Sequence, residues 1–256
     1  MNEFTEQKST YGVGEWAGWS YNIGTGCINN CLYCYARCSA LKNNQILSAA
    51  AWTTEKPKAY KIDIRQHVNE RVMFPSMHDI TQNYLDTFCM ALRNIIKWNN
   101  TVLIVSKPRI ECIERICSEF AEFNRQIEFR FSIGSLDLDV AAFWEPGAPS
   151  PQERIQCLEY AVARGFVASV SMEPILGSRE DAIEDFGLMA PLTNGTIWIG
   201  TMNKIDERVD ISSVEIGNAV ALVSMQQEPE EMIGLYHYLK NEPKIRWKES
   251  IRDLIK

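Results

Sequence analysis

The stretch Gly24-Thr25-Gly26-Cys27-Ile28-Asn29-Asn30-Cys31-Leu32-Tyr33-Cys34-Tyr35-Ala36-Arg37-Cys38 gathers four of the eight cysteines of the chain. Spacings of four and three residues let the thiols of Cys27, Cys31 and Cys34 converge on one metal centre from a single tight loop. Thiolates select soft metal ions and iron–sulfur clusters. Three protein ligands would leave one iron of a [4Fe–4S] cluster open, and the flanking glycines let backbone approach the cluster.

Cys38 leaves a second interpretation open. It follows Cys34 by four residues, which places both on one helical face if the helix has begun. A set of four cysteines could instead hold zinc or a closed electron-transfer cluster, in a binding module without catalysis. The other four cysteines are scattered through apolar segments, where small core hydrophobes are the default interpretation.

Composition is that of a globular protein. The 256 residues are 46% apolar and 23% charged, enough for one substantial domain. We expect a single domain over 1–256, with a core at about 16–204 and a C-terminal helical extension at about 205–256. No run approaches 20 apolar residues and the N-terminus has no signal-peptide pattern, so we expect a cytoplasmic protein without a membrane span. The net charge of −7 does not favour nucleic acid as a partner.

Apolar, β-branched runs alternate with longer helical patterns. Strands are predicted at 20–23, 71–75, 101–106, 127–132, 166–171 and 196–201. Helices are predicted at 34–49, 82–98, 110–124, 151–164, 178–190, 229–240 and 246–255. Strands and helices that alternate in this way indicate βαβ units with right-handed crossovers. The predicted fold class is α/β, a partial (βα)6 TIM-like barrel with parallel strands.

Polar side chains cluster where these strands end, and ligands of such barrels gather at the C-terminal ends of the strands. Those that we take as candidate site residues are Ser76, His78, Asp79, Ser106, Lys107, Ser132 and Glu173. His78 and Asp79 form the polar pair of most interest outside the cysteine cluster. A structural histidine with both nitrogens hydrogen-bonded is an equally good interpretation of His78.

The cysteine spacing, with the aromatic Tyr33 before the third cysteine, resembles the signature of the radical S-adenosylmethionine (SAM) superfamily. The following Tyr35-Ala36-Arg37 resembles a subgroup related to spore photoproduct lyase. Other segments between about Trp16 and Lys204 resemble that subgroup in the same order: 74–79, 105–108, 131–134, 144–154 and 171–174. The resemblance favours the open [4Fe–4S] cluster on Cys27, Cys31 and Cys34 and leaves Cys38 as structural.

The resemblance also implies a chemistry. SAM would chelate the open iron, and the reduced cluster would cleave it to a 5′-deoxyadenosyl radical that abstracts hydrogen from a substrate. An electron donor such as flavodoxin or ferredoxin is implied. SAM contacts are expected at Tyr33, Ser76, Ser106, Lys107, Ser132 and Glu173. His78 and Asp79 are the candidates for catalytic residues, beside the methionine group or the substrate.

The chain departs from spore photoproduct lyases in one informative way. Those enzymes carry a hydrogen-donating cysteine soon after the strand that corresponds to 71–75, and no cysteine occurs here between Cys38 and Cys89. We therefore expect a small-molecule, nucleotide or peptide substrate. The alternatives are a DNA repair enzyme like spore photoproduct lyase, and a protein on this scaffold that has lost turnover.

Overall fold

The computed structural model describes residues 3–256. One sheet of eight strands carries the fold, in the order β1-β2-β5-β6-β7-β8-β9-β10. Within this sheet every pair from β2 to β10 is parallel, whereas β1 is antiparallel to β2. The bounds are β1 Thr5–Glu6, β2 Trp19–Ser20, β5 Val72–Met73, β6 Val102–Ser106, β7 Ile127–Ser132, β8 Val167–Met172, β9 Ile197–Ile199 and β10 Ile245–Trp247.

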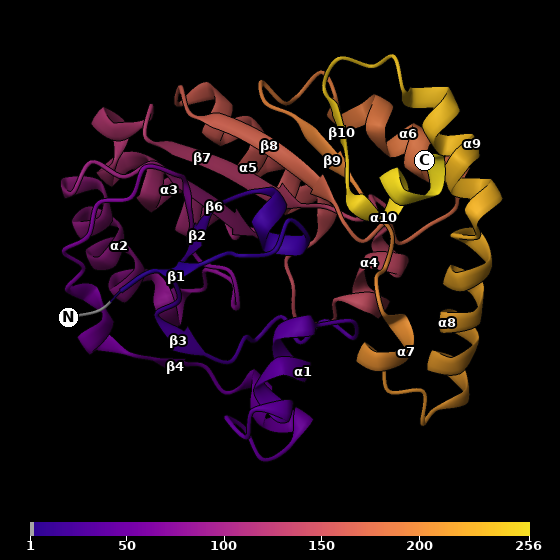
Figure 1. Cartoon of the computed structure of the whole chain (residues 1–256), viewed down its shortest axis with the longest axis horizontal. Coiled ribbons are helices and arrows are strands. Elements are labelled where there is room, and N and C mark those ends of the chain that lie inside the picture. Colours follow the sequence, from indigo (N-terminus) through magenta and orange to yellow (C-terminus); the bar gives the residue numbers. More distant parts are fainter. Residues whose placement is uncertain (1–2) are drawn as a thin grey trace.

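Strands β1 and β10 form the two ends of this sheet and do not pair with each other within residues 3–256, so the barrel is open (Figure 1). The predicted α/β class, a partial barrel with parallel strands, is confirmed. A separate antiparallel pair, β3 (Gly24–Thr25) with β4 (Lys56–Pro57), begins the cysteine loop and was not predicted.

Four helices connect successive strands of the sheet. They are α2 (Gln82–Lys97), α3 (Ile110–Glu119), α5 (Pro151–Ala163) and α6 (Arg179–Met189). Each buries an apolar face, as α2 does with Tyr84, Phe88 and Leu92 at helical spacing. Helix α5 begins as its sequence predicts, because the Ser150 side chain accepts a hydrogen bond from the backbone N–H of Glu153 and Pro151 occupies the first turn.

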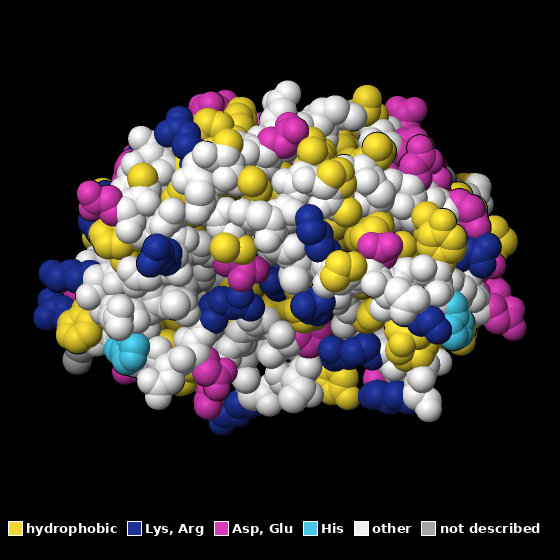
Figure 2. Space-filling view, turned by 90° about the horizontal axis from the view of Figure 1, so that it is seen from above, with side chains coloured by type: hydrophobic (Ala, Val, Ile, Leu, Met, Phe, Trp, Pro, Cys, Tyr) yellow, Lys and Arg dark blue, Asp and Glu magenta, His cyan; other side chains and the backbone are white. Residues whose placement is uncertain are grey.

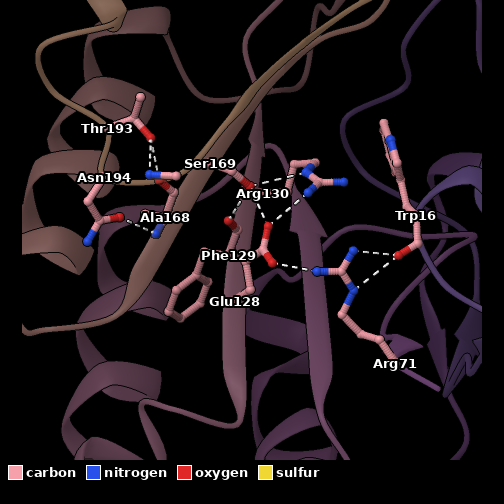
Figure 3. Close-up of polar contacts among 10 residues, drawn as sticks. Trp16, Arg71, Glu128, Phe129, Arg130, Ala168, Ser169, Thr193 and Asn194 are labelled. Atoms are coloured by element: carbon pink, nitrogen blue, oxygen red, sulfur yellow. Dashed lines mark hydrogen bonds and ion pairs between the residues drawn. The ribbon is translucent and has the colours of Figure 1, made fainter. Parts of the chain in front are cut away.

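The two faces of the sheet differ in polarity because side chains alternate along a strand. On β7, Ile127, Phe129 and Phe131 are buried in the apolar core. The alternate residues face the concave side, where Glu128 binds both Arg130 (2.8 Å) and Arg71 (2.5 Å), as Figure 3 shows. These ion pairs fill the sheet's concave side below its C-terminal edge.

Three predicted helices are wrong in part. The helix at 110–124 ends as α3 at Glu119, and only a 3₁₀ turn at Ala121–Phe123 follows. The helix at 34–49 is shorter, because α1 (Tyr35–Lys42) ends before Asn44, which has a left-handed φ of +53°, and a 3₁₀ turn follows at Ala49–Thr53. The helix at 246–255 begins too early. Ile245–Trp247 pairs with the free edge of β9 as strand β10, and only then come α10 (Glu249–Arg252) and a 3₁₀ turn at Asp253–Ile255.

Three helices were not predicted: α4 (Leu138–Trp144), α7 (Ile205–Arg208) and α8 (Val214–Gln226). Helix α9 (Pro229–Leu239) matches the prediction. Further 3₁₀ turns lie at Gly12–Glu15, Ala59–Ile62 and Ala121–Phe123. In Figure 1, α7 lies beside α1 at the C-terminal edge of the sheet.

No helix within residues 3–256 has the length and apolar character that a membrane crossing requires. Figure 2 shows the face seen from above Figure 1. Basic, acidic and apolar side chains are intermixed on it, so charge of one sign does not dominate this face.

Candidate functional site

A cavity of about 690 Å³ opens at the C-terminal ends of the strands. Its volume lies in the range of small-molecule and cofactor sites. The cysteine loop forms one wall and the strand ends form another. Except for Cys38, the ligands and site residues predicted from the sequence all lie on this cavity: Cys27, Cys31, Tyr33, Cys34, Ser76, His78, Asp79, Ser106, Lys107, Ser132 and Glu173. Their roles stay predictions.

The cysteine loop is held by backbone hydrogen bonds to segments far away in the sequence. The N–H of Cys27 donates to the carbonyl of Trp52 (2.8 Å), and that of Leu32 donates to Trp144 (2.9 Å). Cys27 and Cys31 are buried, whereas Cys34 is half-buried and its sulfur caps α1. Within residues 3–256, no three His, Cys, Asp or Glu side chains are arranged around a single metal ion.

Two glycines allow the loop its close backbone contacts. Gly26 has a φ of +97°, and a Cβ there would lie 2.3 Å from the carbonyl oxygen of Thr54. A Cβ on Gly147 would lie 2.1 Å from the carbonyl oxygen of Ile28, inside the loop. The Glu145-Pro-Gly147 segment therefore packs its backbone directly against the backbone between Cys27 and Cys31.

Cys38 does not line the cavity with the other three. Its sulfur lies 3.7 Å from the carbonyl oxygen of Arg208 and 3.9 Å from that of Glu207, both in α7. The side chain therefore joins α1 to α7. This arrangement separates Cys38 from Cys27, Cys31 and Cys34 and does not support a four-cysteine site.

His78 is structurally satisfied. Its Nε2 accepts a hydrogen bond from the N–H of Ile23 (3.3 Å), its Nδ1 donates to the carbonyl of Asp79 (2.9 Å), and its ring stacks on Tyr84. Burial lowers the pKa of His78 from 6.5 to about 4, so the ring is neutral at pH 7. Both ring nitrogens are used in hydrogen bonds to the backbone, so His78 fixes the loop that follows β5.

Asp79 organises the wall between the cysteine loop and β6. One carboxylate oxygen accepts from the Ser106 hydroxyl (2.8 Å) and from the backbone N–H of Lys107 (2.6 Å). The other accepts from the Asn29 amide (2.8 Å) and lies 3.6 Å from the sulfur of Cys27. Asp79 thus contacts a predicted cluster ligand directly.

Lys107 lies over the Tyr33 ring, 5.5 Å from its centroid, and 3.6 Å from a carboxylate oxygen of Glu145. Burial alone would lower the pKa of the Lys107 ammonium. Nearby Cys31, Tyr33 and Glu145 outweigh that effect, so its pKa lies above the usual value. The result is a permanent positive charge beside Cys31.

The remaining predicted residues follow strands and form hydrogen bonds or ion pairs with neighbouring residues. The Ser76 hydroxyl accepts from the Asn22 amide (2.8 Å), and the Ser132 carbonyl accepts from Arg154 (3.1 Å). Burial raises the pKa of Glu173, while Lys248, 3.3 Å away, opposes the rise.

Three residues at or beside the cavity were not among the site residues predicted from the sequence. The sequence of 145–151 favours a rigid loop before a helix, with a glutamate facing the site as the alternative, and the structure makes Glu145 a buried ion-pair centre. Lys248, fully buried, lies within 4.0 Å of carboxylates from Glu15, Glu173 and Glu249. Arg208 lines the cavity beside Tyr35. A charged residue next to Pro-Gly was a weak signal for Glu145, and only tertiary structure places the other two.

The fold and the cysteine loop define a class: a partial α/β barrel with three cysteines at its C-terminal edge. No family model matches the chain, and no curated protein matches its sequence. Solved structures do match. Spore photoproduct lyase complexed with dinucleoside spore photoproduct aligns with a TM-score of 0.61 at 16% identity, over 96% of this chain and 78% of that one.

A variant of the same enzyme with bound AdoMet and dinucleoside spore photoproduct gives a TM-score of 0.60 at 16% identity, with the same coverage. The crystal structure of Streptococcus suis SuiB aligns with a TM-score of 0.50 at 11% identity, over 69% of this chain and 38% of that one. The chain therefore shares the fold of spore photoproduct lyase. The sequence-based resemblance is confirmed at this level.

Proposed function

We propose that this protein is a radical SAM enzyme that binds a [4Fe–4S] cluster on Cys27, Cys31 and Cys34. One observation carries the proposal: these three cysteines, and not Cys38, line the large cavity at the C-terminal edge of a barrel shared with spore photoproduct lyase. Cys27, Cys31 and Cys34 would hold the cluster, which when bound would supply the electron for reductive cleavage of SAM and so the radical chemistry on the substrate.

The donor set fits such a cluster. Each thiolate of a cubane binds a different iron, so the three sulfurs need not meet around one ion. The close approach of Gly147 to Ile28 fixes the loop backbone. Burial raises the pKa of the Cys31 thiol to about 12, and the positive charge of Lys107 opposes that rise and so favours the thiolate that binds iron.

The other residues on the cavity would bind and orient SAM. The Lys107 ammonium can pair with a carboxylate, and the Glu173 carboxylate can accept hydrogen bonds from ribose hydroxyls. Trp16, Trp52 and Met73 supply apolar wall that excludes water from a reactive intermediate. His78 and Asp79 position the loop that contacts Cys27 rather than exchange protons.

A small-molecule, nucleotide or peptide substrate is part of the proposal, as is an electron donor of the flavodoxin or ferredoxin type. The acidic net charge is the reason for placing thymine-dimer repair second. We place the protein in the cytoplasm, where a reducing environment keeps the thiols free.

The proposal is tested by comparing Cys34→Ser with Cys38→Ser after anaerobic reconstitution with iron and sulfide. Cys34→Ser should lose most of the bound iron and the broad visible absorption of the cluster. Cys38→Ser should keep both, because its thiol contacts α7 and not the cavity. Equal loss in the two variants would show a four-cysteine site instead.

A further inference from the structure

The charges around the cavity are unevenly paired. Lys107 is paired with Glu145, Lys248 with Glu173 and Glu249, and Asp253 with Lys256. Arg208 differs, because no carboxylate of residues 3–256 lies within 4.0 Å of its guanidinium and no side-chain hydrogen bond is formed there. Arg208 attracts the Glu173 carboxylate only at longer range. A guanidinium that contacts no carboxylate directly is suited to bind a carboxylate or phosphate in bidentate fashion.

Two contacts hold Arg208 in this place. Its guanidinium lies 5.8 Å from the centroid of the Tyr35 ring, a cation–π contact. Its backbone carbonyl receives the Cys38 thiol, which fixes α7 against α1. The guanidinium is therefore aimed at the cavity by a tyrosine that directly follows the cluster ligand Cys34.

Lys204 adds a second positive charge at the same rim. It directly precedes α7, with a left-handed φ of +55°, and its side chain lines the same cavity as Arg208. Among residues 3–256, the carboxylate within 4.0 Å of its ammonium is that of the exposed Glu207, at 3.9 Å, and the Lys204 side chain is 64% exposed. An anion bound by Arg208 would thus meet two cations, in a chain whose net charge is −7.

We propose that Arg208 and Lys204 form an anion-binding subsite at the mouth of the cavity, and that the substrate carries a phosphate or carboxylate group that they bind. This inference rests on the proposed function and extends it by naming a substrate class. The subsite adjoins Tyr35, so an aromatic or other planar substrate body can lie on that ring while the anionic end contacts α7.

The test uses three small probes of one shape: phenyl phosphate, benzoate and the neutral benzamide. Their binding to the reconstituted protein with SAM present is measured by calorimetry. At least one anion should bind about tenfold tighter than benzamide. A stronger preference for phenyl phosphate identifies phosphate as the group, and one for benzoate identifies carboxylate. Equal binding of all three probes overturns the subsite.

Variants assign the preference to residues. Arg208→Gln should abolish most of the preference, and Lys204→Gln, at an exposed position, should reduce it by a few-fold. Arg125→Gln is the matched control, because Arg125 is exposed and has no ion pair within residues 3–256. It should bind the probes as the wild type does. An Arg208→Gln protein that retains its iron and the full preference contradicts the proposal.

Probe binding requires no turnover, so the two hypotheses fail separately. Anion preference without SAM cleavage leaves the subsite and removes the proposed function. SAM cleavage without a preference for anions supports the proposed function and removes the subsite.

Discussion

Glu145 joins the cavity wall to the barrel through three side chains. Its carboxylate contacts the Tyr33 hydroxyl, lies 3.6 Å from the Lys107 ammonium and forms a 2.5 Å ion pair with Arg154. The Glu145 and Arg154 side chains are each only 1% exposed. Removing one partner of such a group leaves buried charge without compensation, which costs about 3–5 kcal/mol.

Glu145→Gln should therefore lower the free energy of unfolding by about 3 kcal/mol, as measured by urea denaturation, and reduce the iron retained after reconstitution. Glu180→Gln is the control, since Glu180 is 67% exposed and pairs with Arg179 on the surface. It should change stability by about 0.5 kcal/mol or less. Equal effects of the two substitutions would contradict the role given to Glu145.

His78 makes stability depend on pH. The folded pKa of about 4 lies below the ordinary 6.5, so between these values the unfolded chain takes up a proton that the folded state does not. The free energy of unfolding then falls as pH drops from 6.5 towards 4. Between pH 7.5 and 5.0 the loss from this group is at most about 2 kcal/mol.

His78→Gln removes that proton uptake. The variant is less stable at pH 7.5, because the stacking on Tyr84 is lost. It should nevertheless lose about 2 kcal/mol less than the wild type between pH 7.5 and 5.0 in urea unfolding. Parallel pH profiles for the two proteins would show that the ring is not held neutral.

At the residue scale, the sequence was informative wherever a polar side chain ends a strand. Ser106, Lys107, Ser132 and Glu173 were identified because parallel strands bring their C-terminal ends to one edge. The roles of Glu145 and Arg208 depend instead on distant partners, such as Arg154 and Tyr35. No local pattern encodes those contacts, so the sequence did not reveal them.

Among the structural elements, the segment after α4 supports the cysteine loop through its backbone. It approaches the loop backbone to backbone at Gly147, whose N–H donates to the carbonyl of Asn29 (3.0 Å). A side chain at this position would force the two segments apart.

Gly147→Ala should therefore reduce the iron that the reconstituted protein retains and lower its melting temperature. Gly187→Ala is the matched control, because a Cβ at this helical position meets nothing within 4 Å. It should stabilise the protein by about 0.5–1 kcal/mol, since alanine favours a helix over glycine. Unchanged iron retention in Gly147→Ala would mean that the loop does not depend on this contact.

The element predictions succeeded for long amphipathic helices and failed for short segments. Helix α2 was placed within a residue because its apolar spacing extends over 16 residues. Strand β10 has only three residues. They pair with β9, although the sequence pattern there favoured a helix. The early end of α1 at Asn43-Asn44 had a local signal, because asparagine tolerates the left-handed conformation that Asn44 adopts.

For the whole molecule, Lys248 links parts that are remote in the sequence. It is fully buried, with carboxylates of Glu15 at 3.2 Å and Glu173 at 3.3 Å, and it donates to the carbonyl of Gly12 (3.1 Å). Burial and a hydrogen bond with Glu249 raise the pKa of Glu15 to about 7, against the opposing effect of Lys248. The N-terminal segment, β8 and the C-terminal segment thus meet at one wall of the cavity.

The central claim is that this cavity cleaves SAM on a cluster held by three cysteines. The direct measurement is the amount of 5′-deoxyadenosine formed when the anaerobically reconstituted protein is reduced with dithionite in the presence of SAM. We predict that the wild type and Cys38→Ser form it and that Cys34→Ser does not. A wild-type protein that shows the full [4Fe–4S] absorption yet forms no more 5′-deoxyadenosine than Cys34→Ser would contradict the account.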